Sequence, residues 1–370
     1  MRALTVLHLA ANRWWTGSAD PVIQLTSGLT TRGHRVRLGV IPGDRFEAKA
    51  REAGLEPIAG LGLRPRLEPL ALARDVARLR RLAITERVDL IHCHHSHDHW
   101  LAMLVRGAGA RAIPVVRTFH NLRAVKRGAA AAWLYRRTGA TFAVSREIEA
   151  RARQAGIAPE RVIWIPGAVD LRRFRGDADG TPIRDELKLS GRPVIVCVSR
   201  LAPSRGHDLL LAAFRVLLAT SPDARLLLVG KGEARPRLEH LVAELGLAGR
   251  VVFTGYRDRD LPAVLGAADC FALMAAGSDD SCRAVLEAMA SARPVVARRV
   301  GALPETVVHG ETGLLVDDDR PEGVAAALTA VLVDRSRALA MGRAGRRRAE
   351  TEFSPERSVS IVERVYMDLV

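Results

Sequence analysis

The sequence predicts an α/β fold made of two doubly wound domains, each built around a parallel sheet. Short runs rich in Val, Ile and Leu, such as 4–10 and 193–200, alternate with longer amphipathic stretches along the chain. Runs of this kind are typical of strands that are buried on both faces of a parallel sheet. The alternation occurs in both halves, and 370 residues are enough for two domains of ordinary size.

The expected elements follow in chain order. The predicted strands of the first half are 4–10, 34–41, 88–94, 113–120 and 140–145, and those of the second half are 193–200, 224–230, 250–255, 270–275 and 294–298. The stretches with the length of crossover helices are 20–32, 68–87, 208–221 and 236–247.

The domain boundary is predicted in the polar segment 171–193, which is rich in Gly, Pro and Asp. We therefore expect one domain at 1–175 and a second at 176–354. A last helix at 355–370 follows a break at Pro355, and we expect it to pack back on the first domain. Ligands of open parallel sheets bind beyond the carboxyl ends of the strands, so we expect the site in a cleft between the two domains.

Charge and cysteine content limit the class of protein. The net charge is +15, with +16 in residues 1–175 and −1 in the remainder, which favours an anionic partner or a solvated Arg-rich surface for the first half. The four cysteines form no CxxC pair, which argues against a disulfide framework or a zinc knuckle. No run approaches the roughly 18 apolar residues of a membrane span. We expect a cytoplasmic protein, with peripheral contact to the inner face of the cytoplasmic membrane.

A pair of arginines follows the first strand of the second half. Arg200 and Arg205 flank a turn that contains Pro203 and Gly206 and leads into a helix. Guanidinium groups bind phosphate oxygens in a bidentate manner, and the start of a helix adds free N–H donors. The pair therefore indicates a pyrophosphate site, and the alternative is a solvated Arg pair at a strand end.

Two carboxylates are spaced across a loop and a helix in the segment 277–290, GSDDSCRAVLEAMA. Asp279 is expected in the loop, and Glu287 lies about two helical turns further along. Carboxylates only accept hydrogen bonds, which suits them to sugar and ribose hydroxyls. Ala284 and Val285 are expected near the helix start, where backbone N–H groups meet phosphate.

These motifs resemble those of the family-four retaining glycosyltransferases, which have the GT-B fold of two facing Rossmann-like domains with an interdomain cleft. The resemblance covers nearly the whole chain, and the order of the pieces is its most specific feature. The pieces are TGSAD, LTTRGHRV, VDLIHCHH, RTFH and IPGAVD in the first half, and VSRLAPSRG, LLLVGKGE, VVFTGY and SDDSCRAVLEAMASARPVVARRVGALPETVVHGETGLLV in the second.

The resemblance implies a role for each matching position. Glu287 would hold the ribose hydroxyls, and Arg200 would contact the donor phosphates. Arg205 stands where the family usually has Lys, which keeps the charge but changes the geometry. Asp279 stands where the family usually has a Glu that touches the donor sugar. His120 would lie beside the transferring sugar.

The resemblance also implies a reaction. Gly17 and Ser18 match a usual Gly-Gly pair whose backbone approaches the donor phosphates. The activity would be transfer of a sugar from a nucleoside diphosphate sugar to an acceptor hydroxyl, with retention, in cell-envelope glycan synthesis. The sugar nucleotide is a co-substrate, and neither a cofactor nor a metal ion is expected. Attack on the same face, assisted by the leaving phosphate, is the usual proposal for such enzymes.

Other interpretations remain open. The run 92–99, HCHHSHDH, gives His94, His97 and Asp98 a plausible zinc-ligand spacing. A sugar-nucleotide epimerase of the same architecture is an alternative, although such epimerases lack the ordered set formed here by Arg200, Asp279 and Glu287. A non-enzymatic nucleic-acid-binding protein is another, but no recognised module is present and aromatic residues are few. We therefore expect no nucleic-acid partner.

The acceptor is expected on the first domain, where basic residues cluster in two places. Basic side chains beside exposed apolar ones suit contact with anionic lipid, so a glycan or glycolipid acceptor at a membrane surface is expected. A solvated basic face is the alternative. The first cluster holds Arg64, Arg66, Arg74, Arg78, Arg80 and Arg81, and the second holds Arg123, Lys126, Arg127, Arg136 and Arg137 with Trp133 and Tyr135.

Overall fold

The chain forms two compact units, each with its own sheet. The computed structural model describes residues 2–12, 19–63, 68–109, 111–276, 282–317 and 319–370. Within these ranges the first unit comprises residues up to 167 together with 355–370, and the second comprises 168–354. Each unit contains a six-stranded sheet whose strand pairs are all parallel. The predicted α/β class with two doubly wound sheets is therefore confirmed.

The first sheet has the order β2-β1-β3-β4-β5-β6, so its strand order reverses between β1 and β3. Its strands are β1 (Thr5–Ala10), β2 (Arg35–Val40), β3 (Leu90–Cys93), β4 (Val115–Phe119), β5 (Ala140–Ala143) and β6 (Val162–Trp164). The helices of this unit are α1 (Ala19–Thr31), α2 (Arg45–Glu52), α3 (Pro69–Thr85), α4 (Ser96–Val105), α5 (Ala129–Arg136), α6 (Arg146–Gln154) and α15 (Pro355–Leu369), with 3₁₀ turns η1 (Leu122–Ala124) and η2 (Pro159–Arg161).

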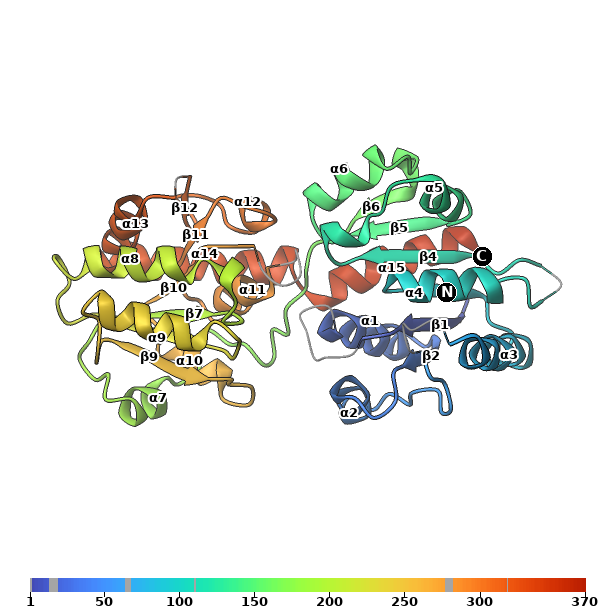
Figure 1. The fold of residues 1–370 in the computed structure, drawn as a ribbon, viewed down its shortest axis with the longest axis horizontal. Helices are drawn as coiled ribbons and strands as arrows, with labels where there is room; N and C mark the ends of the chain where they lie inside the picture. The colour runs from blue at the N-terminus through green and yellow to red at the C-terminus, as the bar shows by residue number, and fades with distance from the viewer. Residues whose placement is uncertain (1, 13–18, 64–67, 110, 277–281, 318) are drawn as a thin grey trace. The chain divides into compact units, whose positions relative to one another are not determined.

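Helices cover both faces of this sheet (Figure 1). One face packs against α3 and α4 through apolar side chains such as Leu9 and Val115. The other face packs against α1 and α15 through side chains such as Val6, Val116 and Tyr366. Successive residues of a strand point to opposite faces, so the buried runs seen in the sequence supply both cores.

The last helix belongs to the first unit, where α15 lies beside α1 (Figure 1). Gly28 of α1 allows this close approach, since a Cβ atom there would lie 2.5 Å from Cγ2 of Val359. Glu363 of α15 accepts hydrogen bonds from Arg32 Nη1 at 2.5 Å and from His34 Nε2 at 2.9 Å. The helix is thus fixed by both close packing and buried polar contacts.

The second sheet has the order β12-β11-β10-β7-β8-β9, so its strand order reverses between β7 and β10. Its strands are β7 (Val194–Val198), β8 (Arg225–Val229), β9 (Val251–Gly255), β10 (Cys270–Leu273), β11 (Val295–Arg298) and β12 (Gly313–Val316). The helices are α7 (Thr181–Glu186), α8 (His207–Leu217), α9 (Arg235–Glu244), α10 (Leu261–Gly266), α11 (Arg283–Ala290), α12 (Leu303–Thr306), α13 (Pro321–Val333) and α14 (Arg335–Glu352), with the 3₁₀ turn η3 (Pro203–Arg205).

The predicted linker at 171–193 is wrong as a description of this segment. Although the segment is polar overall, three of its apolar side chains are buried in the core of the second unit: Phe174, Ile183 and Leu189. The segment also contains α7. Two strands, β6 and β12, were not predicted from the sequence. Among the helices of the described ranges, none has both the length and the hydropathy needed to cross a bilayer.

Candidate functional site

The two candidate arginines of the second unit lie where the strand order reverses. Arg205 ends the turn η3 after β7, and its Nη1 donates to the carbonyl oxygen of Ala276, beyond the end of β10, at 2.8 Å. Gly206 follows with a φ of 68°, and a Cβ atom there would lie 2.8 Å from the carbonyl oxygen of Met274. The backbone of the turn therefore packs directly on the end of β10. In open α/β sheets this reversal point is where ligands bind.

Arg200 lies two residues beyond β7 and points into solvent. Its side chain is 64% exposed and forms an ion pair with Glu233 at 2.9 Å. Glu233 follows β8, and the two loops are joined by a hydrogen bond from Leu201 N to Lys231 O at 3.1 Å. Exposed ion pairs of this kind contribute little free energy, so an anionic ligand can displace Glu233 at small cost.

Glu287 is almost fully buried on α11. It is 4% exposed and accepts a hydrogen bond from Arg283 Nε, one turn earlier, at 2.7 Å. Cys282, which precedes the helix, has a φ of 51°. The amide of Val285 donates to Cys282 O at 2.9 Å, so this N–H group is already used within the first turn. Ala284 lies beside it on the same turn.

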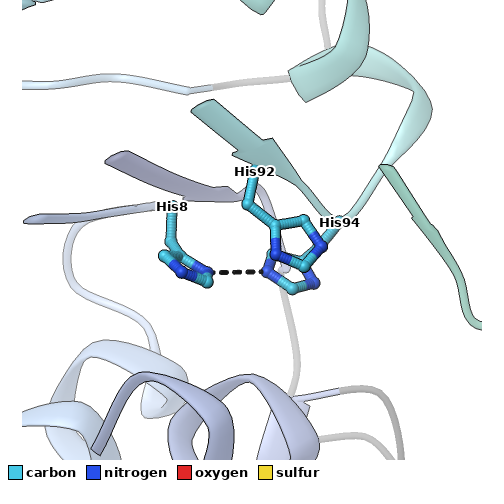
Figure 2. A group of neighbouring side chains, drawn as sticks. All are labelled: His8, His92 and His94. Atoms are coloured by element: carbon cyan, nitrogen blue, oxygen red, sulfur yellow. Dashed lines mark hydrogen bonds between the residues drawn. The ribbon is translucent and has the colours of Figure 1, made fainter. Parts of the chain in front are cut away.

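His120 follows β4 at the carboxyl edge of the first sheet. Its side chain is buried, and its Nε2 lies 3.2 Å from Nδ1 of His94, the residue that follows β3. The other nitrogen of His94 lies 3.1 Å from Nδ1 of His8, on β1 (Figure 2). His8 and His92 are register partners on β1 and β3, at the reversal point of this sheet. Figure 2 shows the three rings of His8, His92 and His94 turned toward one another.

The fold does not bring together the alternative zinc trio of His94, His97 and Asp98, whose spacing in the sequence was plausible, as a metal-binding group among the described residues. Asp98 instead accepts hydrogen bonds from the amides of His95 at 2.9 Å and Ala11 at 3.2 Å. The atoms that come within 4.8 Å of one another belong to His8, His92 and His94, a spacing close enough for a metal ion.

The ring nitrogens of this trio have other partners. Both nitrogens of His8, His92 and His94 lie within hydrogen-bond distance of a neighbouring ring or hydroxyl. The polar capacity of the trio is therefore met by the protein itself. The group can be explained without an ion.

Burial controls the charge of these side chains. It lowers the pKa of His8 to about 3 and holds the pKa values of His94 and His120 well below their usual range. The imidazole of His95 and the buried guanidinium of Arg117 add to this effect at His120. Burial also raises the pKa of the Asp98 carboxyl to about 7. The imidazoles are therefore neutral at neutral pH.

The described residues include only part of the predicted set. Gly17, Ser18 and Asp279 lie outside them. Arg200, Arg205 and Glu287 all belong to the second unit, and His120 belongs to the first. Reading the sequence did not single out the partners Glu233, Arg283, His8 and Tyr366. A His in the middle of the apolar run 4–10 was the one available signal.

The basic surface of the first unit includes α3. Arg74, Arg78, Arg80 and Arg81 are all exposed on this helix. Two large apolar side chains are also exposed there, Leu70 at 77% and Ile84 at 57%.

An exposed aromatic pair lies nearby, where Trp100 of α4 stacks on Trp133 of α5 with ring centroids 5.8 Å apart. Arg137 lies over the Trp133 ring at 4.3 Å. The expectation that Tyr135 shares this surface is wrong, because Tyr135 is buried and its hydroxyl accepts from Lys126 N at 2.9 Å. Trp100 takes its place as the second aromatic residue of the surface.

A pocket of about 230 Å³ adjoins α3. The titratable residues that line this pocket are Glu68, Asp75 and His97. Asp75 is held by hydrogen bonds from Gly62 N and Leu63 N, both at 2.8 Å. Carboxylate acceptors beside an imidazole suit a polyhydroxylated ligand.

Comparison with known proteins links both halves of the chain to one group of enzymes. Residues 16–173 match the family model described as Glycosyltransferase Family 4, and residues 181–348 match the model described as Glycosyl transferases group 1. The chain is 31% identical to a D-inositol 3-phosphate glycosyltransferase of Segniliparus rotundus, over 93% of this chain and 84% of that protein.

A second relative is a GDP-mannose-dependent alpha-(1-6)-phosphatidylinositol monomannoside mannosyltransferase of Mycolicibacterium smegmatis. It is 41% identical over 49% of this chain and 50% of that protein, so the match spans about half the length of this relative.

Solved structures share the architecture. An Anabaena protein, HepE, solved with UDP and glucose, has a TM-score of 0.84 at 20% identity, covering 98% of this chain and 99% of that one. A glycosyltransferase from Rickettsia africae has a TM-score of 0.88 at 18% identity, covering 100% and 99%. These likenesses confirm the expected GT-B fold class.

Proposed function

Because this chain belongs to glycosyltransferase family 4, we propose that it transfers a sugar, with retention, from a nucleoside diphosphate sugar to a hydroxyl of a lipid-linked or anionic glycan at a membrane surface. One observation carries the donor half of this proposal. Arg205 joins β7 to the end of β10 at the reversal point of the second sheet, with Arg200 on the same loop. Two guanidinium groups at such a point suit a diphosphate.

The diphosphate is also the leaving group, so negative charge grows on it as the glycosidic bond breaks. Positive groups that are already in place stabilise this charge without reorganisation. The bond to Ala276 holds Arg205 in place, whereas the partner of Arg200 among the described residues is the exposed Glu233. We assign Arg205 to the fixed contact and Arg200 to a contact that forms when the donor binds.

The nucleoside is assigned to α11. Glu287 is a buried carboxylate that Arg283 orients through a 2.7 Å contact, which suits it to accept hydrogen bonds from a ribose diol. Ala284, at the first turn, is assigned to a phosphate oxygen, and Val285 joins it only if its bond to Cys282 opens. Asp279, Gly17 and Ser18 keep the roles that the family resemblance gives them.

His120 is assigned to the transferring sugar. As a neutral ring it orients or polarises an oxygen atom and does not act as a cation. The proposed chemistry is attack by the acceptor hydroxyl on the face from which the diphosphate leaves, through an oxocarbenium-like transition state. The diphosphate takes up the proton of the acceptor hydroxyl. We expect no requirement for a divalent metal ion.

The acceptor is assigned to the first unit. The pocket beside α3 offers Asp75 and Glu68 to acceptor hydroxyls, and the exposed arginines of α3 suit an anionic lipid surface. The names of the two relatives refer to inositol phosphate and phosphatidylinositol mannoside. An acceptor with a phosphoinositol group is therefore the first to test.

A two-step experiment tests the function. Thermal shift with UDP-, GDP- and ADP-sugars should identify one nucleotide that raises the melting temperature, because a ligand of the native state stabilises it. Transfer of the matching sugar is then measured by mass spectrometry on phosphoinositol-containing and neutral lipid acceptors, with and without EDTA. No shift with any nucleotide sugar would contradict the donor assignment, and loss of activity in EDTA would contradict the metal-free mechanism.

A further inference from the structure

A continuous line of hydrogen bonds crosses the interior of the first unit and ends at His120. It begins on β4, passes through α15 and β1, and returns to the carboxyl edge of the sheet. We call it the histidine chain. Its members, in order, are Thr118, His92, Tyr366, His8, His94 and His120.

The first links lie beneath α15. Thr118 Oγ1 lies 2.7 Å from His92 Nε2, and His92 Nδ1 lies 2.5 Å from the Tyr366 hydroxyl. The same hydroxyl lies 3.4 Å from His8 Nε2, which is the longest link. A single side chain of α15 therefore joins the imidazoles of two neighbouring strands.

The remaining links run toward the candidate site. His8 Nδ1 lies 3.1 Å from His94 Nε2, the contact drawn in Figure 2. His94 Nδ1 lies 3.2 Å from His120 Nε2. The second nitrogen of His120, Nδ1, has no partner among the described residues and is left for a ligand.

The rings are neutral, and this fixes how the hydrogens are arranged. A neutral imidazole has one N–H donor and one acceptor nitrogen, so a ring that donates on one side must accept on the other. Each link holds one hydrogen. With the tyrosine hydroxyl both donating and accepting, the links all run in the same direction, either from Thr118 to His120 or the reverse.

Thr118 decides between the two directions. Its side chain is 3% exposed, and His92 is the one hydrogen-bond partner that the described residues give its hydroxyl. If His92 donated to Thr118, the threonine O–H would be left buried without an acceptor, which is costly. In the direction from Thr118 to His120, every O–H and N–H group of the chain donates to the next member. His94 then donates to His120 Nε2, and the proton of His120 is on Nδ1.

We propose that the histidine chain is a positioning device that holds His120 as the Nδ1–H tautomer, a neutral hydrogen-bond donor to an oxygen atom of the bound sugar. Tyr366, His8, His94 and Thr118 act through His120 and are positioning residues. This inference rests on the proposed function, in which His120 lies beside the transferring sugar. The inference specifies that Nδ1 of His120 donates to the sugar, and it names the residues that hold His120 in this tautomer.

The direct test is the tautomer of His120, read from long-range ¹H–¹⁵N NMR spectra of the full chain at pH 7.5, with His120→Gln used for assignment. Protonated and unprotonated ring nitrogens have well-separated ¹⁵N shifts. We expect the proton on Nδ1 in the wild type. Tyr366→Phe removes the central hydroxyl and should give a mixture of tautomers, as should Thr118→Val, whereas Thr118→Ser should restore the wild-type spectrum.

Tyr135→Phe is the matched control, because it removes a buried tyrosine hydroxyl outside the chain. It should leave the tautomer unchanged. In sugar transfer, Tyr366→Phe should lower kcat by the same factor as the population of the Nδ1–H form measured by NMR, with little change in the KM of the donor. Thr118→Ser and Tyr135→Phe should keep the kcat of the wild type.

The outcomes separate this inference from the function on which it rests. A proton on Nε2 of His120 in the wild type, or an unchanged tautomer in both Tyr366→Phe and Thr118→Val, would overturn the histidine chain whatever the activity. Wild-type turnover by His120→Ala would overturn the role of His120 in transfer, while the NMR result would still report on the chain. Melting temperatures of all variants exclude loss of folding as the cause.

Discussion

Arg205 and Ala276 are joined across the reversal point of the second sheet. The guanidinium Nη1 of Arg205 donates to the carbonyl oxygen of Ala276 at 2.8 Å, although 71 residues separate them. The bond to a backbone carbonyl oxygen fixes the position of a cation at the carboxyl edge of the sheet. A lysine at this position would have a single donor nitrogen to divide between Ala276 and a phosphate.

Replacing Arg205 should therefore reduce transfer more than it reduces stability. We expect Arg205→Ala to lower kcat/KM by about 10²–10³-fold, the usual cost of removing one preorganised donor from a developing anion. Steady-state kinetics with the identified donor measures this. Arg215→Ala is the control, because Arg215 is exposed in the last turn of α8, far along the helix from this loop. Equal activity of the two variants would contradict the assignment.

Glu287 should act on donor binding. We expect Glu287→Gln to raise the KM of the nucleotide sugar about tenfold, because an amide cannot accept two hydrogen bonds from a diol as strongly as a carboxylate. The pair with Arg283 is buried, so some stability is lost as well. Binding of the nucleoside diphosphate alone, measured by calorimetry, separates the two effects. Unchanged affinity in a folded variant would show that Glu287 has only a structural role.

The close packing of α15 on α1 predicts that a larger side chain at the contact will lower the free energy of unfolding. A Cβ atom at Gly28 would lie 2.5 Å from Cγ2 of Val359, so Gly28→Ala should overpack the interface and destabilise the protein by about 1–3 kcal/mol. Urea unfolding measures the loss. Val359→Ala removes the clashing methyl groups, so the double variant should be more stable than Gly28→Ala alone. A double variant that loses the sum of both single effects would contradict the packing.

Part of this architecture is visible in the sequence and part is not. The strands of both sheets follow from runs of Val, Ile and Leu, because burial on both faces demands apolar side chains at every position. The segment VIW at 162–164 is too short for this signal. The link between His92 and Tyr366 depends on α15 returning to the first unit across 274 residues, which local pattern does not reveal. Arg283 likewise becomes the partner of Glu287 only once α11 exists.

Acid should destabilise the protein. Burial lowers the pKa of His8 to about 3 and that of His99 to about 2, and lowers those of His92, His94 and His120 as well. Below the unfolded value of about 6.5, the unfolded chain binds protons that the native rings do not. Each ring then lowers the free energy of unfolding by about 1.4 kcal/mol per pH unit.

One group acts in the opposite direction. The pKa of Asp98 is raised to about 7, so between pH 7 and about 4 the native state binds a proton that the unfolded state lacks, which offsets one ring. Stability should therefore fall steeply between pH 6.5 and 4.5. Urea unfolding at pH 7.5, 6.5 and 5.5 measures the slope. A free energy of unfolding that stays constant over this range would show that the rings are not buried as neutral groups.

The first unit should bind anionic membranes through α3. We expect the double variant Arg80→Ser/Arg81→Ser to reduce co-sedimentation with anionic vesicles at least tenfold, since each basic residue at such a surface contributes about 1 kcal/mol. Trp133→Ala should weaken binding further through loss of the pair with Trp100. Arg343→Ser/Arg347→Ser changes two exposed arginines of α14 and serves as the control. Equal binding by both double variants, or no preference for anionic over zwitterionic vesicles, would contradict a specific surface.

The return of α15 to the first unit sets the order in which the protein matures during synthesis. The second unit can close once residue 354 has left the ribosome, but the first unit lacks Glu363 and Tyr366 until after that. Until then His34 and His92 have no partner from the helix, and the apolar face that α15 covers is exposed. The half of the chain that is made first is therefore the half that finishes folding last.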